Sequence, residues 1–367
     1  MSAYNRLLRI INIYYNMKIA IDCRFIGKSG IGTYIENILD ELVHNHPKNE
    51  YLLIADKTFD DYVSFSNIRY VITDIKPFSL KELFLFPVDE INKCDAFFTP
   101  YINIPGRIKI PVYSTIHDVI FLDLPELVSK VGLLIRKFFI WRATRISKVI
   151  FTRSFFSKER ILFHFPHSNE IKIVRNCMSN GIINFNTGDI VKQNYFIFIG
   201  NIKAHKGLNT LLKAFEIAQQ QGLDSKLVIV GSSEKFRTSD KDVTYLLANL
   251  KNVEFTGWVD NNKLFELLSS AKALVLPSRY EGFGIAPLEA LYLGTNAIIS
   301  DIPVLKEVYN SYPVSFFNVD NPESLCSALL QPQESIDLEK IREKINNDFN
   351  RRIEDDKLIN CIADNSL

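Results

Sequence analysis

The stretch from Ser278 to Gly294, SRYEGFGIAPLEALYLG, decides the fold of the second half of the chain. It begins at the end of the apolar run ALVLPS, which is typical of a buried strand, and it ends in APLEALYLG, which is typical of a helix. Between these runs Glu281 precedes Gly282, Phe283 and Gly284, so the chain can turn sharply there. A carboxylate at the end of a buried strand needs a polar partner, and ligand hydroxyl groups would provide one.

Apolar runs of strand length alternate with helix-length segments on both sides of this stretch. Strands that are buried on both faces and alternate with helices indicate a parallel sheet covered by helices. The expected strands are MKIAID (17–22), YLLIAD (51–56), AFFTP (96–100), PVYSTIHD (111–118), KVIFTRS (148–154), YFIFIG (195–200), KLVIVG (226–231), VEFTG (253–257), ALVLPS (273–278) and NAIISD (296–301). The expected helices include segments starting at Thr33 and Val131 and the ranges 208–222, 261–271 and 286–294.

The pattern is interrupted by a polar stretch at 184–194 and then restarts, which predicts two domains. A chain of 367 residues is also long for a single domain. We expect an α/β protein with a Rossmann-like domain at 17–185, a second at 190–340, and a cleft between them. The segment 341–367 has helical spacing and is expected to pack back near the domain junction. The first sixteen residues are left out of this prediction.

The composition indicates a soluble globular protein of the cytoplasm. Hydrophobic residues make up 47% of the chain, and the formal net charge is +1. The five cysteines are widely spaced and form no CxxC pair, which argues against a disulfide framework or a zinc site. No apolar run reaches the roughly 18 residues of a membrane helix. The opening segment also lacks the uncharged core of a signal peptide.

A second candidate loop is FIGNIKAHKGLNTLL, in which Gly200 and Asn201 follow a strand and Lys206 precedes a helix. A lysine at a helix amino terminus opposes the helix dipole unless an anion lies between them. That anion would be a diphosphate. The alternative is a solvated surface lysine.

A third candidate loop is GKSGIGTYIENIL, where Gly27, Gly30 and Gly32 follow the strand that ends at Asp22. Small residues there let main-chain amides approach a phosphate at the helix start. A plain turn is an equally open interpretation, because glycine-rich loops are common.

Two further titratable residues lie where ligands of open α/β sheets bind, beyond the carboxyl ends of strands. Glu289 falls in the first turns of the helix that follows Glu281, where the helix dipole favours a carboxylate. Its alternative role is simple electrostatic capping. His117 follows a strand of the first half and is expected to titrate near neutrality, although a structural histidine is the alternative.

Together GNIKAHKG, EGFGIAPLE, SGIG and TIHD resemble the family-four retaining glycosyltransferases of GT-B fold, from about Met17 to Gln331. The segment MKIAIDCRFIGKSGIGTYIENIL is similar to the branch that builds bacterial O-antigen, capsule and exopolysaccharide, in which many members use GDP-mannose. The resemblance implies transfer of a hexose from a nucleotide-sugar donor to a growing surface polysaccharide or lipid-linked oligosaccharide, with retention of configuration.

By this resemblance Glu281 would contact the hydroxyl groups of the donor sugar, and Glu289 those of the ribose. Lys206 would contact the diphosphate. Main-chain groups from Gly282 to Ile285 would hold the sugar and phosphates, and 255–261 would lie beside the base.

The resemblance also implies roles for three other residues. Gly32 would approach the diphosphate from the first domain, with Gly30 beside it. His117 would contact the sugar near its anomeric centre. Many relatives carry arginine after the glycine of GN, whereas this chain has Asn201, so one phosphate charge could be left to Lys206 alone.

No cofactor or metal is expected, because Lys206 and main-chain amides would meet the charge that develops on the departing diphosphate. Two alternatives stay open from the sequence. One is a nucleotide-sugar epimerase of the same fold, and the other is a catalytically silent subunit that binds the nucleotide sugar.

Between Lys130 and Phe165 nine lysines and arginines accompany one glutamate and several aromatic residues. This mixture suits an anionic bilayer surface, where each positive charge contributes about 1 kcal/mol. We therefore expect peripheral contact of the first domain with the inner face of the plasma membrane, unless the aromatics are core. Nucleic acid is not an expected partner, because no binding module accompanies the charges. The aromatic residues are Phe138, Phe139, Trp141, Phe151, Phe155, Phe156, Phe163 and Phe165.

Overall fold

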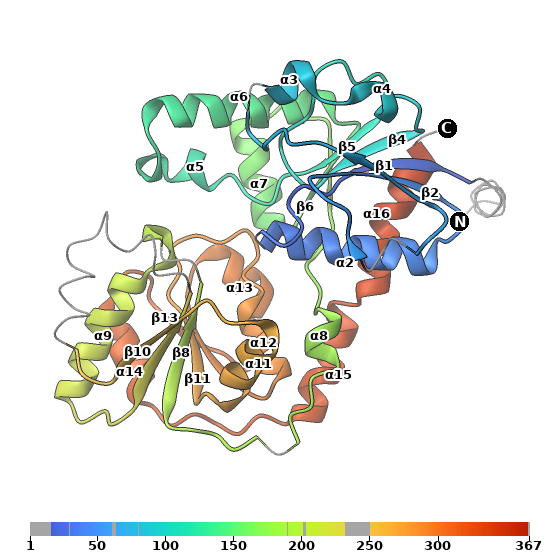
Figure 1. Ribbon diagram of the computed structural model, residues 1–367. Helices are drawn as coiled ribbons and strands as arrows, with labels where there is room; N and C mark the ends of the chain where they lie inside the picture. Colours follow the sequence, from blue (N-terminus) through green and yellow to red (C-terminus); the bar gives the residue numbers. More distant parts are fainter. Residues whose placement is uncertain are drawn as a thin grey trace, which may run out of the picture. The chain divides into compact units, whose positions relative to one another are not determined.

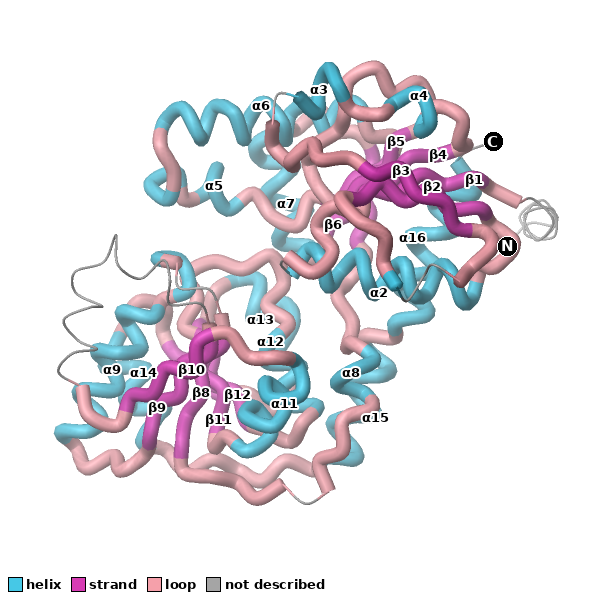
Figure 2. The backbone as a smooth tube through the Cα atoms, in the orientation of Figure 1, coloured by secondary structure: helices cyan, strands magenta, loops and turns pink. Residues whose placement is uncertain are grey.

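The computed structural model describes residues 16–28, 30–60, 64–79, 81–188, 190–200, 203–231 and 250–365. The chain divides into two compact units. Unit 1 comprises Met1–Arg175 and Arg352–Leu367, and unit 2 comprises Asn176–Arg351. Each unit contains one parallel sheet with helices packed against it (Figures 1 and 2).

The sheet of unit 1 is parallel throughout, and its order within the described residues is β3-β2-β1-β4-β5-β6-β7. The order runs outward in both directions from the pair β1 and β4, as in nucleotide-binding α/β folds. The strands are β1 (Lys18–Asp22), β2 (Glu50–Ala55), β3 (Ile68–Ile72), β4 (Ala96–Thr99), β5 (Val112–Thr115), β6 (Val149–Thr152) and β7 (Glu170–Ile173).

Helices cover both faces of this sheet because side chains alternate along each buried strand. Ile19 and Ile21 of β1 pack with α2 and α16, whereas Ala20 packs in the cluster that holds α4, α6 and α7. The helices of unit 1 are α2 (Gly30–Asn45), α3 (Lys81–Leu85), α4 (Val88–Ile91), α5 (Ile120–Asp123), α6 (Lys130–Ile146), α7 (Phe155–His164) and α16 (Arg351–Asn365). Apart from its first residue, the final helix belongs to unit 1.

Unit 2 has the corresponding strand order among its described residues, β10-β9-β8-β11-β12-β13, again parallel. Its strands are β8 (Tyr195–Ile199), β9 (Lys226–Val230), β10 (Val253–Gly257), β11 (Ala273–Leu276), β12 (Asn296–Ser300) and β13 (Ser315–Phe317). Its helices are α8 (Asn180–Ile183), α9 (Leu208–Gln220), α11 (Asn261–Ser270), α12 (Ala286–Tyr292), α13 (Pro303–Tyr309), α14 (Pro322–Leu330) and α15 (Leu338–Asp348). Helices α9 and α14 pack on one face.

The predicted strands and helices are confirmed, and the fold class is α/β as expected. The strands β3, β7 and β13 were not foreseen, because each lies at a sheet edge and is only partly buried. None of the described helices is long and apolar enough to cross a membrane.

Candidate active site

The candidate site of unit 2 lies at the carboxyl ends of β8 and β11, which are neighbours in the sheet. The strand order reverses between these two strands, and loops leaving such a pair diverge and leave space for a ligand. Gly200 and Lys206 follow β8, and Glu281 follows β11. The strand pairing therefore brings together two loops that are 75 residues apart in sequence.

A glycine allows these two loops to touch. Gly207 has a φ of 69°, and a Cβ atom built on it would lie 1.8 Å from the carbonyl oxygen of Pro277. The amide of Arg279 donates a hydrogen bond of 2.8 Å to the carbonyl oxygen of His205. Any larger residue at position 207 would push the loops apart, so this glycine sets the distance between Lys206 and the loop after β11.

Lys206 and Glu281 form an ion pair in which Nζ lies 2.7 Å from Oε1. Ser278 Oγ donates to the same Oε1 at 2.6 Å. The two side chains are 24% and 11% exposed, so the pair is shielded but can be reached from solvent. The structure thus brings together a cation suited to an anionic group and a carboxylate suited to hydroxyl groups, as the sequence predicted for one site.

The turn from Gly282 to Ile285 is held in place by contacts with the core of unit 2. The Phe283 ring is buried and packs edge-on against Phe349 at 5.7 Å between centroids. Gly284 has a φ of 79°, and its carbonyl oxygen accepts a hydrogen bond from the Tyr309 hydroxyl. The Phe283 side chain is therefore a core contact, and a main-chain contact with a ligand stays a prediction for this turn.

Glu289 lies in the first turn of α12, as expected, and is half-buried. Burial raises the pKa of its carboxyl group to about 7. The sequence argument gave the helix dipole the larger weight, which would lower the pKa. In a helix of seven residues the cost of removing the carboxylate from water is the larger effect.

In unit 1, His117 follows β5, and both of its ring nitrogens have protein partners. Nε2 lies 2.9 Å from the carbonyl oxygen of Pro100, so the proton belongs on Nε2. Nδ1 then accepts a long contact of 3.5 Å from Nε of Arg153. Burial and the positive charge of Arg153 lower the pKa of His117 to about 3. The expectation that His117 titrates near neutrality is wrong.

Arg153 was missed in the sequence, although it stands directly after the apolar run of β6. It is 2% exposed, and its guanidinium lies 3.6 Å from the centroid of the Tyr34 ring. Nη1 donates to the carbonyl oxygen of Val174 at 2.7 Å. A charged residue immediately after a buried strand was the available signal. Arg153 and the carbonyl group of Pro100 together fix His117 in one tautomer.

The predicted glycines of unit 1 differ from each other in their surroundings. Gly30 and Gly32 lie inside the first turn of α2, not in the loop before it. A Cβ atom at position 32 would lie 2.3 Å from the carbonyl oxygen of Phe25, whereas one at position 30 would meet nothing within 4 Å. Packing alone accounts for Gly32. Asn201 lies outside the described residues.

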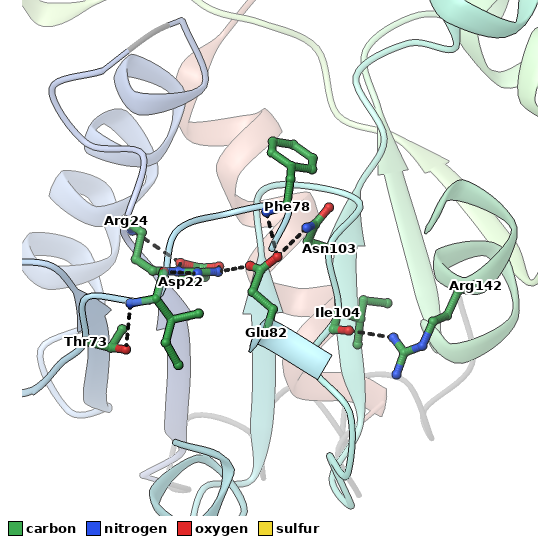
Figure 3. A network of polar contacts seen from close by, with 9 residues as sticks. Asp22, Arg24, Thr73, Phe78, Glu82, Asn103, Ile104 and Arg142 are labelled. Atoms are coloured by element: carbon green, nitrogen blue, oxygen red, sulfur yellow. Dashed lines mark hydrogen bonds and ion pairs between the residues drawn. The ribbon is translucent and has the colours of Figure 1, made fainter. Parts of the chain in front are cut away.

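A buried polar network, also missed in the sequence, occupies the corresponding strand ends of unit 1 (Figure 3). Arg24 donates through Nε to Asp22 at 2.9 Å and through Nη2 to Glu82 at 2.6 Å. Glu82 also accepts from the amide of Phe78 at 2.7 Å and from the side chain of Asn103. Arg24, Asp22 and Glu82 are each 1% exposed, so their charges compensate one another inside the protein.

The described part of the chain holds no group of three or more histidine, cysteine, aspartate or glutamate side chains that could bind a metal ion. Asp240 and Asp242 have an Asp-x-Asp spacing, which can serve metal binding, and they lie outside the described residues.

Part of the second half of the chain matches a known protein family. Residues 182–345 match the family described as "Glycosyl transferases group 1". This range contains Lys206, Glu281 and Glu289, together with the strand pair that positions them. The resemblance to GT-B glycosyltransferases of the O-antigen branch is therefore confirmed for this range.

Three of the relatives that match this chain are named for O-antigen synthesis. The chain is 29% identical over 220 residues to the O-antigen chain mannosyltransferase RfbU of Salmonella typhimurium, covering 59% of each chain. It is 26% identical over 224 residues to O-antigen chain mannosyltransferase B of Escherichia coli, covering 57% of this chain and 58% of that one. The chain thus spans under two thirds of these two mannosyltransferases. It is 24% identical to the O-antigen biosynthesis glycosyltransferase WclY of Escherichia coli, over 85% of this chain and 88% of that one.

Solved structures confirm the GT-B fold. Anabaena Alr3699/HepE in complex with UDP-glucose superposes with a TM-score of 0.71 at 14% identity, over 95% of this chain and 100% of that one. Sucrose-phosphate synthase from Thermosynechococcus elongatus superposes with a TM-score of 0.69 at 17% identity, over 94% of this chain and 98% of that one.

Proposed function

We propose that the protein transfers a hexose from a nucleotide sugar to a growing surface polysaccharide or lipid-linked oligosaccharide, with retention of configuration. GDP-mannose is the leading donor. The observation that carries this proposal is the pair Lys206 and Glu281, 2.7 Å apart at the strand reversal of a group 1 glycosyl transferase domain. The proposed location is the cytoplasm, at the inner face of the plasma membrane.

The chemistry of the pair suits both halves of such a donor. When the donor binds, the Lys206 ammonium turns from Glu281 to the diphosphate, and the Glu281 carboxylate turns to the sugar hydroxyls. Glycosyl transfer passes through an oxocarbenium-like state while negative charge gathers on the departing phosphate oxygen. The Lys206 ammonium and main-chain amides from Gly282 to Ile285 would stabilise that charge, and we propose that no divalent metal is needed.

Glu289 would accept hydrogen bonds from the ribose hydroxyls in its ionised form. Because burial raises its pKa to about 7, donor binding would favour loss of a proton from this carboxyl group. The proposal therefore includes a donor affinity that rises with pH between about 6 and 8. His117 is retained as a contact of the donor sugar, acting as a neutral imidazole.

Mannose is favoured because two relatives are named O-antigen mannosyltransferases. A uridine nucleotide is the competing choice, since the Anabaena structure holds UDP-glucose. A thermal-shift screen of the full chain against GDP-mannose, UDP-glucose and a TDP-hexose separates these donors. A ligand at a hundred times its Kd stabilises the folded state by about 2.7 kcal/mol. A shift with GDP-mannose that is absent in Lys206→Ala and Glu281→Ala supports the proposal, and no shift with any of the three contradicts it.

The transfer step needs its own assay. Labelled donor, incubated with lipid extract from a polysaccharide-producing bacterium, should give labelled lipid-linked product whose new bond keeps the donor configuration by NMR. Isomerised nucleotide sugar without acceptor would identify an epimerase instead. Donor binding without any product would identify a silent subunit. Activity that is lost with EDTA would contradict the metal-free mechanism.

A further inference from the structure

Helix α6 of unit 1 is apolar on two opposite faces. Phe139, Ile140 and Ala143 are buried against the sheet. The other face carries large apolar side chains that are exposed to solvent. We call this set the outer face of α6: Val131 at 66%, Leu134 at 66%, Ile135 at 50%, Phe138 at 46% and Trp141 at 47% exposed.

The spacing of the outer face shows that it is one continuous stripe. Its members follow one another at intervals of three or four residues, apart from the adjacent Leu134 and Ile135, and such residues lie above one another on a helix. The rings of Phe138 and Trp141 are 6.1 Å apart between centroids. Scattered apolar side chains on a surface are ordinary, but an ordered stripe of this kind marks a contact surface.

The charge around the stripe has a single sign. Helix α6 contains five basic residues and no acidic residue. Arg136 stacks on the ring of Phe121 at 4.4 Å, and Arg142 donates to the carbonyl oxygen of Ile104 at 2.6 Å. The other three basic residues, Lys130, Lys137 and Arg145, are exposed. The nearest carboxylates in sequence that are exposed are Glu126 before the helix and Glu159 on α7.

The polar network of Figure 3 fixes this helix beside α3. Asn103 bonds to Glu82 of α3, and the next residue, Ile104, accepts the hydrogen bond from Arg142 of α6. The same loop continues to Arg107, whose Nη2 donates to the carbonyl oxygen of Phe84 at 2.8 Å. Helices α3 and α6 lie next to each other in Figure 1.

The end of α3 adds two more exposed apolar side chains. Phe84 and Leu85 are 68% and 64% exposed. The loop from Asn103 to Arg107 is thus hydrogen-bonded to both α3 and α6, and each of these helices carries exposed apolar side chains.

We propose that the outer face of α6, with Phe84 and Leu85, docks on an anionic lipid bilayer. Apolar side chains would enter the boundary between headgroups and acyl chains, and Lys130, Lys137 and Arg145 would contact anionic headgroups. A second copy of the chain joined through the same face would set basic helix against basic helix. A nucleic acid would satisfy the charges but would leave the aliphatic side chains in water. An anionic bilayer accommodates both the basic side chains and the apolar ones.

The structure corrects the surface expected from sequence. Phe139, Phe151 and Phe165 are buried in the core and cannot reach a membrane. Phe138 and Trp141 remain on the proposed surface. The docking surface does not rest on the proposed transferase activity, because vesicle binding requires neither donor nor acceptor.

The two tryptophans of the chain allow a direct test. Trp141 lies on the outer face, and Trp258 lies in unit 2, where it is 82% exposed. In a Trp258→Phe background, fluorescence comes from Trp141 alone. We expect it to shift to the blue when vesicles of three parts phosphatidylcholine to one part phosphatidylglycerol are added at low salt. Vesicles of pure phosphatidylcholine should cause at least a tenfold smaller bound fraction, and added salt should reverse binding.

Flotation of the full chain with the same vesicles compares matched variants. Trp141→Ser should lower the bound fraction at least fivefold, while Trp258→Ser should leave it unchanged. Lys137→Glu combined with Arg145→Glu should lower it at least tenfold. Failure of the unsubstituted chain to float at low salt, or equal losses for the two tryptophan variants, overturns the proposal. Concentration-dependent dimerisation that is abolished by Trp141→Ser, without flotation, would assign the surface to a second copy instead.

Discussion

The two units have related strand orders and use charge differently at the place where the order reverses. At β1 and β4 of unit 1, Asp22, Arg24 and Glu82 are each 1% exposed and bond to one another. At β8 and β11 of unit 2, Lys206 and Glu281 are 24% and 11% exposed. The first arrangement is closed to ligands, and the second is open to them.

The hydrogen bonds explain this difference. Arg24 also donates through Nη1 to the carbonyl oxygen of Ile75 at 2.8 Å, so each guanidinium nitrogen has a protein acceptor. Burial alone would lower the pKa of Arg24, but the carboxylates of Asp22 and Glu82 raise it above its ordinary value. In unit 2 Lys206 and Ser278 both donate to Oε1 of Glu281. Buried charge in unit 1 therefore serves structure, and the charge in unit 2 can serve binding.

The largest effect is expected for Arg24→Met. Removing one member of a buried ionic network leaves the other charges without compensation and costs about 3–5 kcal/mol of unfolding free energy. Unfolding of unit 1 can be followed by Trp141 fluorescence in urea, in the Trp258→Phe background.

The control for this prediction is an exposed pair in the same unit. Lys28 and Asp56 have side chains that are 48% and 41% exposed, so Lys28→Met should cost no more than about 0.5 kcal/mol. Equal losses for Arg24→Met and Lys28→Met would show that the closed network does not stabilise unit 1.

The next effect is on turnover. Glu281→Ala should reduce transfer at least a hundredfold, which corresponds to about 2.7 kcal/mol of transition-state stabilisation. The unfolding curve of the chain, followed by far-UV circular dichroism, should move little, since Lys206 is partly exposed and water can solvate its charge when Glu281 is removed. The comparison variant is Lys306→Met, which removes the exposed partner of the half-buried Asp301. Near-normal turnover of Glu281→Ala would remove this residue from the mechanism.

Sequence patterns predicted the fold and the closeness of two side chains in unit 2 because both depend on local order. Apolar runs such as ALVLPS mark buried strands, and parallel pairing forces their carboxyl ends to one edge. Lys206 and Glu281 follow two such strands, so their proximity could be inferred from the order of motifs alone.

Features set by long-range packing could not be predicted in this way. Glu82 joins Arg24 across 58 residues, and Arg153 meets His117 across 36. Neither partner carries a local signal for the other. The pKa values of His117 and Glu289 are dominated by burial, which depends on every element packed around the side chain. For Glu289, its position in the sequence indicated only the smaller effect, that of the helix dipole.

The third prediction concerns pH. The pKa of Glu289 rises from an ordinary 4.5 to about 7 in the folded chain. The unfolded chain therefore loses this proton first, and the stability of unit 2 falls as pH rises from about 4.5 through 7. For a fully buried carboxylate the loss at pH 8 would be about 3 kcal/mol. Because Glu289 is only half-buried, we expect Glu289→Gln to gain about 2 kcal/mol over the unsubstituted chain at pH 8, with no gain at pH 4. Urea unfolding followed by far-UV circular dichroism at pH 4 and at pH 8 measures the gain at each pH.

The same substitution separates stability from binding. Glu289→Gln should weaken donor binding at pH 8 and abolish its rise with pH, because an amide does not ionise. A variant that gains stability and keeps full donor affinity would show that Glu289 lies away from the ribose. A variant without any pH-dependent gain would contradict the burial argument.

The smallest effect tests whether unit 1 also offers its main chain to the donor. Gly30→Ala places a methyl group in open space and adds a better helix former in the first turn of α2, so unit 1 should gain about 0.5 kcal/mol. If the donor phosphates approach this turn, the same methyl group should lower turnover several-fold, opposite in sign to the change in stability. Gly32→Ala is the comparison, since its Cβ would meet the Phe25 carbonyl at 2.3 Å and should destabilise unit 1. Unchanged turnover in Gly30→Ala would mean that position 30 only starts a helix, and that the donor is held by unit 2 without this turn.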